Sequence, residues 1–308
     1  MTLSAPKMKW TRGGRIFDAS GQRPWMVSHA AMPIADPLDG DRCRVYFSSR
    51  DERNRARIGF FEMRLSDPHA ILTVSDEPVL DLGPLGAFDD SGVTGGCLVA
   101  TGGRKYLYYS GWTLGRTVPF YFYVGLAVSD DGGLTFRRVS PAPILERNAV
   151  DPYLTASPSV LIEDGRWRMW YVSGSGWSIE GGVPQHRYHI RYAESRDGIV
   201  WSRSGLVCLD YASPGEHAFS RPCVVREGSR YRMWFSARGP AYRLGYAESA
   251  DGLIWERDDA CAGLDVTDAG WDSEMIAYSF VFVAAGRTWM LYNGNGYGRT
   301  GIGYAVGV

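Results

Sequence analysis

The chain has 308 residues, of which 45% are hydrophobic, and its 33 Lys and Arg residues nearly balance its 34 Asp and Glu residues. This balance argues against a nucleic-acid-binding protein, and no run of 18 apolar residues indicates a transmembrane helix. The five cysteines are widely spaced and lack a Cys-x-x-Cys pair, so neither a zinc knuckle nor a disulfide framework is expected. Without an apolar signal-peptide core at the start, a cytoplasmic and soluble protein is expected.

The first predicted strand is the short segment "MKWTR", from Met8 to Arg12. It is followed by an apolar run, "WMVSHAAMPIA", an alternating aromatic run, "CRVYFSSR", and a third segment, "IGFFEM". A weaker fourth segment, "ILTVS", comes next. Alternation together with aromatic and β-branched residues predicts strands, and the short turns between them predict antiparallel hairpins.

The same order of segments recurs along the rest of the chain. The third segment returns as "VGLAVS", "IRYAES", "LGYAES" and "IGYAVG", and the fourth returns as "LTFRR", "IVWSR" and "LIWER". After "IGYAVG" the chain ends at Val308, so this last unit lacks its fourth strand. "MKWTR" matches the missing segment, which predicts that the N-terminal strand completes the last unit.

The turns before the fourth segment carry a recognisable signature. "AESRDGIVW" and "AESADGLIW" place Asp-Gly where a tight turn needs a positive φ, and the Ser and Asp side chains are expected to bond to turn amides. "SDDGGLTF" also matches the Asp box of sialidases. A sialidase is one interpretation of this match, but an outer turn remote from any active site explains it better.

Repeats of this length predict an all-β fold, a five-bladed β-propeller with four antiparallel strands per blade. The N-terminal strand closes the last blade. The whole chain, 1–308, would then form one domain, with blades at about 22–80, 88–145, 152–210, 217–262, and 272–308 together with 8–17.

In a propeller, loops that enter the first strands and loops that join second to third strands share one face, where function is expected. Four of the five first-strand loops carry carboxylates, which we expect to converge on the central axis, where like charges shift each other's pKa. Asp90, Glu216 and Glu274 are the predicted catalytic residues. The predicted substrate-binding residues are His29, Arg50, Asp51, Trp112, Asp151, Trp177, His186, Arg221, Arg238, Asp272, Tyr278 and Asn293.

Several of these residues have a structural alternative. One of Asp89 and Asp90 is expected to cap a turn, and Asp151 before Pro152 is a common way to open a turn. Arg221 is also a candidate ion-pair partner for Glu216, and His29 is a candidate core histidine. Glu274 has the weakest structural alternative, because it precedes a strongly apolar strand, where a lone carboxylate is costly to bury.

The five repeats, the acids before the first strands and the "A-x-S-x-D-G-x-x-W" hairpin resemble the five-bladed propeller glycosidases of glycoside hydrolase families 43, 32, 68 and 130. The resemblance implies a carbohydrate substrate and two acting carboxylates. Enzymes of families 43 and 32 begin the first blade with an Asp, where this chain has His29, and carry their acid, a Glu, in blade three, where this chain has Asp151. Some relatives hold a central calcium, but no ligand spacing predicts a metal or cofactor here.

Two functional hypotheses follow. The first is an enzyme that cleaves or transfers a glycosidic bond, with Glu274 as general acid and Asp90 as base or nucleophile. The second is a non-catalytic carbohydrate-binding propeller. A scaffold for protein partners has only the fold in its favour, and the oligomeric state is not predicted.

Overall fold

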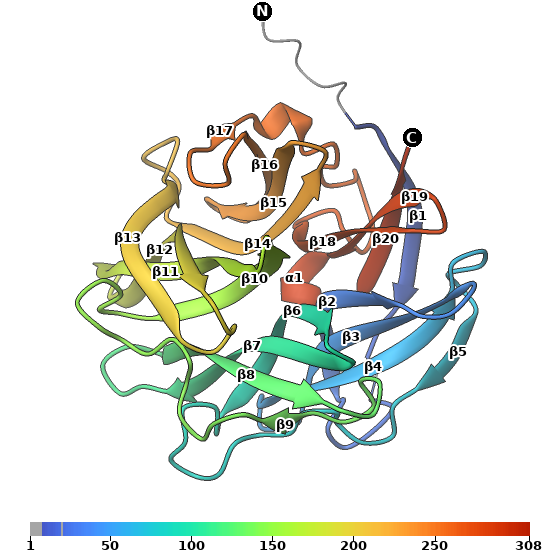
Figure 1. The fold of residues 1–308 in the computed structure, drawn as a ribbon, viewed down its shortest axis with the longest axis horizontal. Coiled ribbons are helices and arrows are strands. Elements are labelled where there is room, and N and C mark those ends of the chain that lie inside the picture. The colour runs from blue at the N-terminus through green and yellow to red at the C-terminus, as the bar shows by residue number, and fades with distance from the viewer. Residues whose placement is uncertain (1–7, 20) are drawn as a thin grey trace, which may run out of the picture.

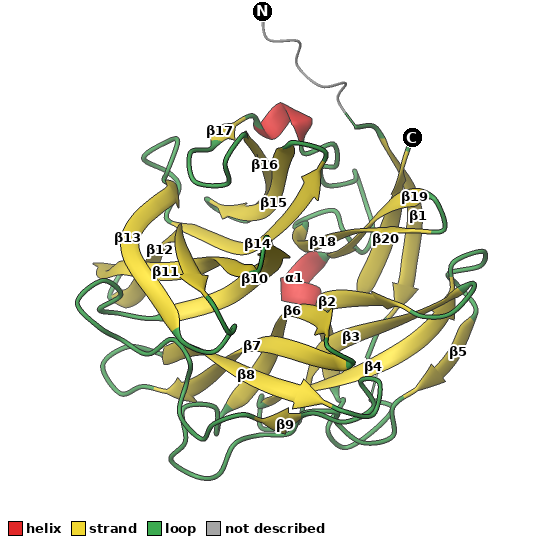
Figure 2. Cartoon of the chain, viewed as in Figure 1, coloured by secondary structure: helices red, strands yellow, loops and turns green. Residues whose placement is uncertain are grey.

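The protein is described by a computed structural model that covers residues 8–19 and 21–308. Its regular secondary structure is almost wholly β-strand, and the strands are arranged around a centre (Figures 1 and 2). The predicted all-β class is confirmed. The strands form one four-stranded sheet, β1-β20-β19-β18, and two sheets of eight strands each. Each eight-stranded sheet consists of two antiparallel groups joined by a single parallel bridge, Ala56 to Gly92 or Tyr188 to Ala218.

Pairing within residues 8–19 and 21–308 therefore gives five groups of four strands, which we number in chain order. The first two groups are β2 (Ser28–Pro37), β3 (Arg42–Arg50), β4 (Ala56–Arg64) and β5 (Ile71–Val74), then β6 (Gly92–Thr101), β7 (Arg104–Leu114), β8 (Phe120–Ser129) and β9 (Arg137–Arg138). The third and fourth are β10 (Thr155–Glu163), β11 (Arg166–Glu180), β12 (Val183–Ser195) and β13 (Trp201–Leu209), then β14 (Ala218–Glu227), β15 (Arg230–Arg238), β16 (Tyr242–Ser249) and β17 (Glu256–Arg257). The fifth is β18 (Ala277–Ala284), β19 (Arg287–Asn293), β20 (Ile302–Gly307) and β1 (Trp10–Phe17).

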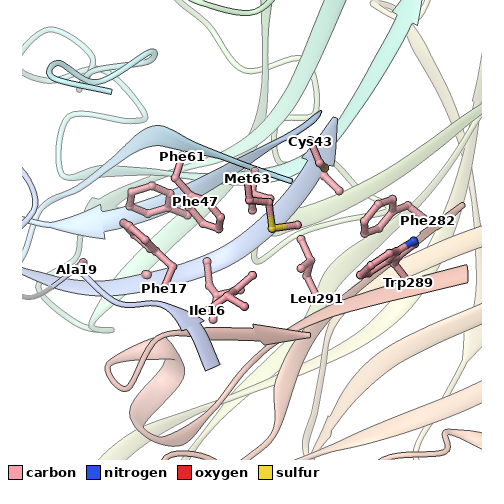
Figure 3. Packing of buried hydrophobic residues seen from close by; sticks show 14 of the residues in the cluster. Ile16, Phe17, Ala19, Cys43, Phe47, Phe61, Met63, Phe282, Trp289 and Leu291 are labelled. Atoms are coloured by element: carbon pink, nitrogen blue, oxygen red, sulfur yellow. The ribbon is translucent and has the colours of Figure 1, made fainter. Parts of the chain in front are cut away.

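The two ends of the chain meet in the fifth group. Strand β1 pairs antiparallel with β20, with Trp10 opposite Gly307 and Arg12 opposite Ala305. This confirms that the N-terminal segment completes the last group. Figure 3 shows the core beneath this junction, where Phe17 and Ile16 of β1 lie with Phe47 of β3 and Leu291 of β19.

The outer turns have the predicted chemistry. Ser195 Oγ donates to Asp197, whose carboxylate accepts the backbone N–H groups of Ile199 (2.8 Å) and Val200 (2.9 Å). Gly198 follows with a φ of 74°. The Trp201 ring then packs edge-on against Tyr108 of the second group, with centroids 6.0 Å apart. The signature repeated in the sequence is therefore a turn, as predicted, and its Trp also makes a contact between groups.

The first strand of every group contains a register shift, and four of the five strands have a non-glycine residue with positive φ at that shift: Met32, Ser157, Arg221 and Tyr278. Backbone N–H groups at these shifts donate to the second strand of the preceding group. Ser157 donates to Ser110 Oγ (2.8 Å) and Tyr278 to Ser236 Oγ (2.8 Å). Met32 donates to Asn293 Oδ1 (2.9 Å), which links the fifth group back to the first.

Two short helical segments interrupt the strands, the 3-10 turn Asp259–Cys261 and α1 (Asn295–Gly298). Helix α1 lies between β19 and β20 and projects into the centre of the ring of strands (Figure 1). None of the helices in the described part of the chain is long and apolar enough to cross a membrane.

Candidate functional site

The carboxylate before the first strand of the third group accepts hydrogen bonds at both of its oxygens. Asp151 is fully buried and accepts hydrogen bonds from Tyr171 Oη (2.9 Å) and Ser173 Oγ (2.6 Å). Arg203, at the end of the "IVWSR" segment, donates to Asp151 Oδ2 at 3.1 Å. A buried carboxylate needs such partners, because an unpaired charge is costly in the interior. Asp151 therefore ties the start of the first strand to the outermost strand.

The same arrangement recurs in three other groups, and we call each instance an entrance pair. The entrance pairs are Asp89 with Arg138, Asp151 with Arg203, Glu216 with Arg257, and Asp272 with Arg12. In each one the arginine lies two residues after the aromatic residue of the fourth segment, as in "FRR", "WSR", "WER" and "WTR". In the first group Trp25 precedes the first strand, and its ring stacks on Phe47 at 6.2 Å.

The entrance pairs correct the prediction that these acids converge on the axis. Asp151, Glu216 and Asp272 are directed to arginines of the outer strands. Burial acts to raise the pKa of Glu216. The hydrogen bonds from Arg257 and from the backbone of Ala212 outweigh burial, so the pKa is lowered. Arg257, and not Arg221, is its ion-pair partner. The catalytic role predicted for Glu216 is untested, and its contacts are those of a structural group.

Asp90 and Glu274 lie outside the entrance pairs. Asp90 is half-buried and accepts hydrogen bonds from Ser91 Oγ (2.8 Å) and Gly86 N (2.9 Å). Burial raises the pKa of Asp90, but these hydrogen bonds lower it by more, so its pKa lies below the ordinary value for Asp. Glu274 is exposed, so the expected burial cost is wrong. Its backbone N–H donates to Asn295, and its carbonyl accepts from Arg243. No contact among the described residues joins Asp90, Glu216 and Glu274.

Two predicted substrate-binding residues instead hold the centre of the fold. Arg221 is 1% exposed, donates to the carbonyl oxygens of Pro33 (2.6 Å) and Gly95, and lies over the Phe280 ring. Burial lowers its pKa to about 10. Asn293 is fully buried and donates to the carbonyls of Ala30 (2.6 Å) and Gly301 (2.9 Å). Both side chains bond to backbone carbonyls, and their predicted role in substrate binding stays a prediction.

Asp51 also has structural partners. It accepts from Arg55 Nε (2.9 Å) and Arg57 Nη1 (2.8 Å) in the turn after β3. Burial opposes its ionisation, but hydrogen bonds from Arg55 and Arg57 prevail and lower its pKa to about 2. Asp51 thus pairs with two arginines of its own turn, and its predicted role in substrate binding stays a prediction.

Four predicted residues, Arg50, His186, Arg238 and Tyr278, do lie in one cluster, together with four that were not predicted. We call it the hub cluster, and it comprises half-buried or buried side chains from the first, third, fourth and fifth groups and from α1: Arg50, His186, Tyr188, His217, Arg238, Tyr242, Tyr278 and Tyr297.

Ring contacts connect the members of the hub cluster. His186 stacks on Tyr188, with centroids 4.3 Å apart and an interplanar angle of 7°, and lies 5.9 Å from His217. The Arg238 guanidinium lies 5.4 Å from the Tyr242 ring and 5.5 Å from the Tyr297 ring. Tyr242 in turn lies 5.7 Å from Tyr278. The chain thus gathers cations and phenols from distant segments into one cluster.

The electrostatics of the hub cluster are positive. Burial, followed by Arg238 and His217, lowers the pKa of His186 to about 3. Burial, followed by Arg50 and Arg299, lowers the pKa of His29 to about 4, and His29 bonds to Ser28 at 3.0 Å. Burial raises the pKa of Tyr278, with neighbouring Tyr242 and Tyr297 adding to the rise. At neutral pH these histidines are neutral and this phenol keeps its proton.

Aromatic side chains extend the hub cluster along the β11–β12 hairpin. The ring centroid of Trp177 lies 5.9 Å from that of His186 and 5.3 Å from that of Phe120 of β8. Trp112 lies 6.2 Å from Phe122. Among the described residues no group of three or more His, Cys, Asp or Glu side chains is arranged to hold a metal ion.

The predicted site residues did not include His217 or the tyrosines Tyr188, Tyr242 and Tyr297. Tyr297 lies in the loop between the second and third strands of its group, and Tyr242 begins a third strand. The rule that selected Arg238 and Asn293 therefore also covers these tyrosines. They were passed over because aromatic residues near strand ends are usually core.

Comparison with solved structures shows the class of fold. A "Glycoside hydrolase" superposes with a TM-score of 0.73 at 19% identity, covering 96% of this chain and 91% of that one. A "thermostable family-43 glycoside hydrolase" gives 0.67 at 18% identity, covering 91% and 88%. An endo-arabinase from Bacteroides thetaiotaomicron gives 0.63 at 13% identity, covering 96% and 97%. The protein thus has the fold of the β-propeller glycoside hydrolases, as its repeats predicted.

Two sequences identify the family. "Uncharacterized protein MT1551" and "Uncharacterized protein Rv1502", from two strains of Mycobacterium tuberculosis, are each 44% identical over 299 residues, which is 97% of this chain and 99% of each relative. The chain belongs to the family of these two proteins. No protein-family model matches it.

Proposed function

We propose that this protein is a carbohydrate-active propeller of five blades in one domain, with its ligand bound at the hub cluster. The five strand groups support the blade count. The hydrogen bond from Met32 to Asn293 and the β1–β20 pairing support closure of the ring. Closure would matter for the site because it would hold Tyr278 of the fifth group near Arg50 of the first, whose charge acts on the Tyr278 phenol.

The hub cluster is the observation that carries the proposal. Aromatic faces stack on the apolar faces of sugar rings, while guanidinium, imidazole and phenol groups bond to hydroxyls. Binding sites typically combine apolar walls with a few convergent polar groups, and the hub cluster with Trp177 and Phe120 has this composition. Glycoside hydrolases that share the fold make a carbohydrate the ligand class that fits it best.

The chemistry proposed is cleavage or transfer of a glycosidic bond by two carboxylates. Asp90 and Glu274 are the candidates, since Glu216 is held by Arg257. Asp90, with its lowered pKa, suits the base or nucleophile, and Glu274 the acid. Their separation would be about 5 Å in a retaining enzyme and roughly 6.5–9.5 Å in an inverting one.

A non-catalytic carbohydrate-binding propeller is the second candidate. The entrance pairs favour it, because they give carboxylates before four first strands arginine partners of their own. In that case the hub cluster alone would account for function.

Turnover separates the two candidates. A panel of aryl glycosides and oligosaccharides is incubated with wild type, Asp90→Asn, Glu274→Gln and the control Asp164→Asn, which alters an exposed turn residue. An enzyme releases product, and the first two variants lose turnover while retaining ligand. If glycans bind to the wild type without any release, the non-catalytic candidate holds. If no glycan in the panel binds or reacts, both candidates fail.

A further inference from the structure

The half-buried arginines of the entrance pairs and those of the hub cluster differ in their partners. In the entrance pairs, Arg138, Arg203 and Arg257 each meet a carboxylate within 3.1 Å. In the hub cluster, Arg50 bonds to the neutral Asn54 amide at 2.9 Å, and Arg238 lies over two phenol rings. Across residues 8–19 and 21–308, neither of these two arginines forms an ion pair. A chain with 34 acidic residues has left them without one.

We propose that the hub cluster binds a sugar carrying an acidic group, a carboxylate or a phosphate, and that Arg50 and Arg238 hold its oxygens. This inference rests on the proposed carbohydrate function and narrows its substrate class.

The free-energy cost of leaving a guanidinium group without a counter-charge favours an anionic ligand at the hub cluster. A cation withdrawn from water is unfavourable unless a counter-charge or hydrogen-bond acceptor meets it. The planar guanidinium group matches the geometry of carboxylate and phosphate oxygens and donates two parallel hydrogen bonds to them. An anion at the hub cluster supplies the charge that the protein does not.

A second, independent observation points the same way. His186 Nε2 is buried and has no hydrogen-bond partner within the described chain. Buried polar atoms without partners are rare in native structures. His186 lies beside His217 and Trp177, so the hub cluster contains hydrogen-bonding capacity that the described chain leaves unused.

Other occupants explain less. A neutral sugar satisfies the phenols and Trp177 but leaves both guanidinium charges without compensation. A cationic ligand is opposed by Arg50 and Arg238 directly. The phenols, whose pKa values are raised by burial, stay protonated and serve as further donors to oxyanions.

The test measures binding to matched acidic and neutral probes. Wild type is applied to an array that pairs neutral glycans with their uronate and phosphorylated counterparts, and calorimetry adds inorganic phosphate and glucuronate. The same measurements are made on Arg50→Gln, Arg238→Gln and the control Arg287→Gln. Arg287 is the exposed first residue of β19, so its variant removes one positive charge outside the hub cluster. Unfolding curves confirm that each variant is folded, and Arg50→Lys and Arg238→Lys serve where Gln does not fold.

Acidic glycans are expected to bind at least about tenfold more tightly than their neutral partners. Gln at either hub arginine should remove this preference, while Arg287→Gln retains it. Preference for uronates or for phosphorylated sugars identifies the source of the oxyanion. Equal binding of acidic and neutral glycans, unaffected by the hub variants, overturns the anion site but leaves the carbohydrate function. Phosphate binding with no glycan binding overturns the carbohydrate function, and no binding of any probe overturns both.

Discussion

The guanidinium of Arg12 donates a hydrogen bond to the carboxylate of Asp272, 260 residues later in the chain. Asp272 is 2% exposed and also bonds to Tyr292 Oη at 3.2 Å. The pair is one of four that repeat around the fold, and the only one of them whose arginine comes from the opposite end of the chain.

Replacing Arg12 by Gln is expected to lower the free energy of unfolding by about 3–5 kcal/mol, because it leaves Asp272 buried without its cation. Urea denaturation measures the loss. The matched control is Arg15→Gln, whose side chain is 46% exposed and lies 3.6 Å from Asp18, and it should change stability by less than about 1 kcal/mol. Equal midpoints for the two variants would show that the Arg12 pair does not stabilise the last group.

Glu216→Gln and Glu274→Gln should differ in stability. Glu216 accepts two hydrogen bonds from Arg257, which keeps Asp259 as a second partner, so we expect a loss of about 1–3 kcal/mol. Glu274 is exposed and should lose less than about 0.5 kcal/mol. Thermal unfolding compares them, and an equal fall in Tm for both variants would contradict the structural role of Glu216.

The free energy of unfolding of the protein should depend on pH through His186. Its pKa falls from 6.5 to about 3 in the folded state, chiefly because of burial. Below pH 6.5 the unfolded chain therefore binds more protons at this site, and stability falls as the pH decreases toward 3, by at most about 1.4 kcal/mol per pH unit.

His186→Gln should flatten this part of the profile, which is measured by urea denaturation between pH 4 and 8. His69→Gln, at an exposed position, is the control and should retain the wild-type slope. An unchanged slope in His186→Gln would mean that this histidine is protonated in the folded protein.

Alanine at Gly198 should be costlier than at Gly165. Both glycines have positive φ, 74° and 73°. A Cβ at Gly198 would lie 2.6 Å from Tyr108 Oη, whereas a Cβ at Gly165 meets nothing within 4 Å. We expect Gly165→Ala to cost about 1–2 kcal/mol from backbone strain alone, and Gly198→Ala to cost roughly 1–3 kcal/mol more from overpacking. Chemical denaturation of the two variants tests the difference, and equal losses would contradict the inter-group contact at this turn.

Much of the fold was predictable because its signals are local. The Asp-Gly turns, the alternating strands and the unfinished last repeat depend on residues a few positions apart, and the pairing of β1 with β20 confirmed them. Arg50, His186, Arg238 and Tyr278 were also found, since the loops that carry them could be located from the strand order. The direction of the acidic side chains could not be located in this way.

The amino-acid sequence by itself determined the repeat, its turns and the loops from which a site is built, because hydrophobic periodicity and turn chemistry act over short distances. Only the tertiary structure decided that Asp151, Glu216 and Asp272 bond to outer-strand arginines, while Arg50 and Arg238 form no ion pair with any residue that the structure describes. A charged side chain takes the partner that lies nearest in space. For Asp272 that partner is Arg12, at the other end of the chain.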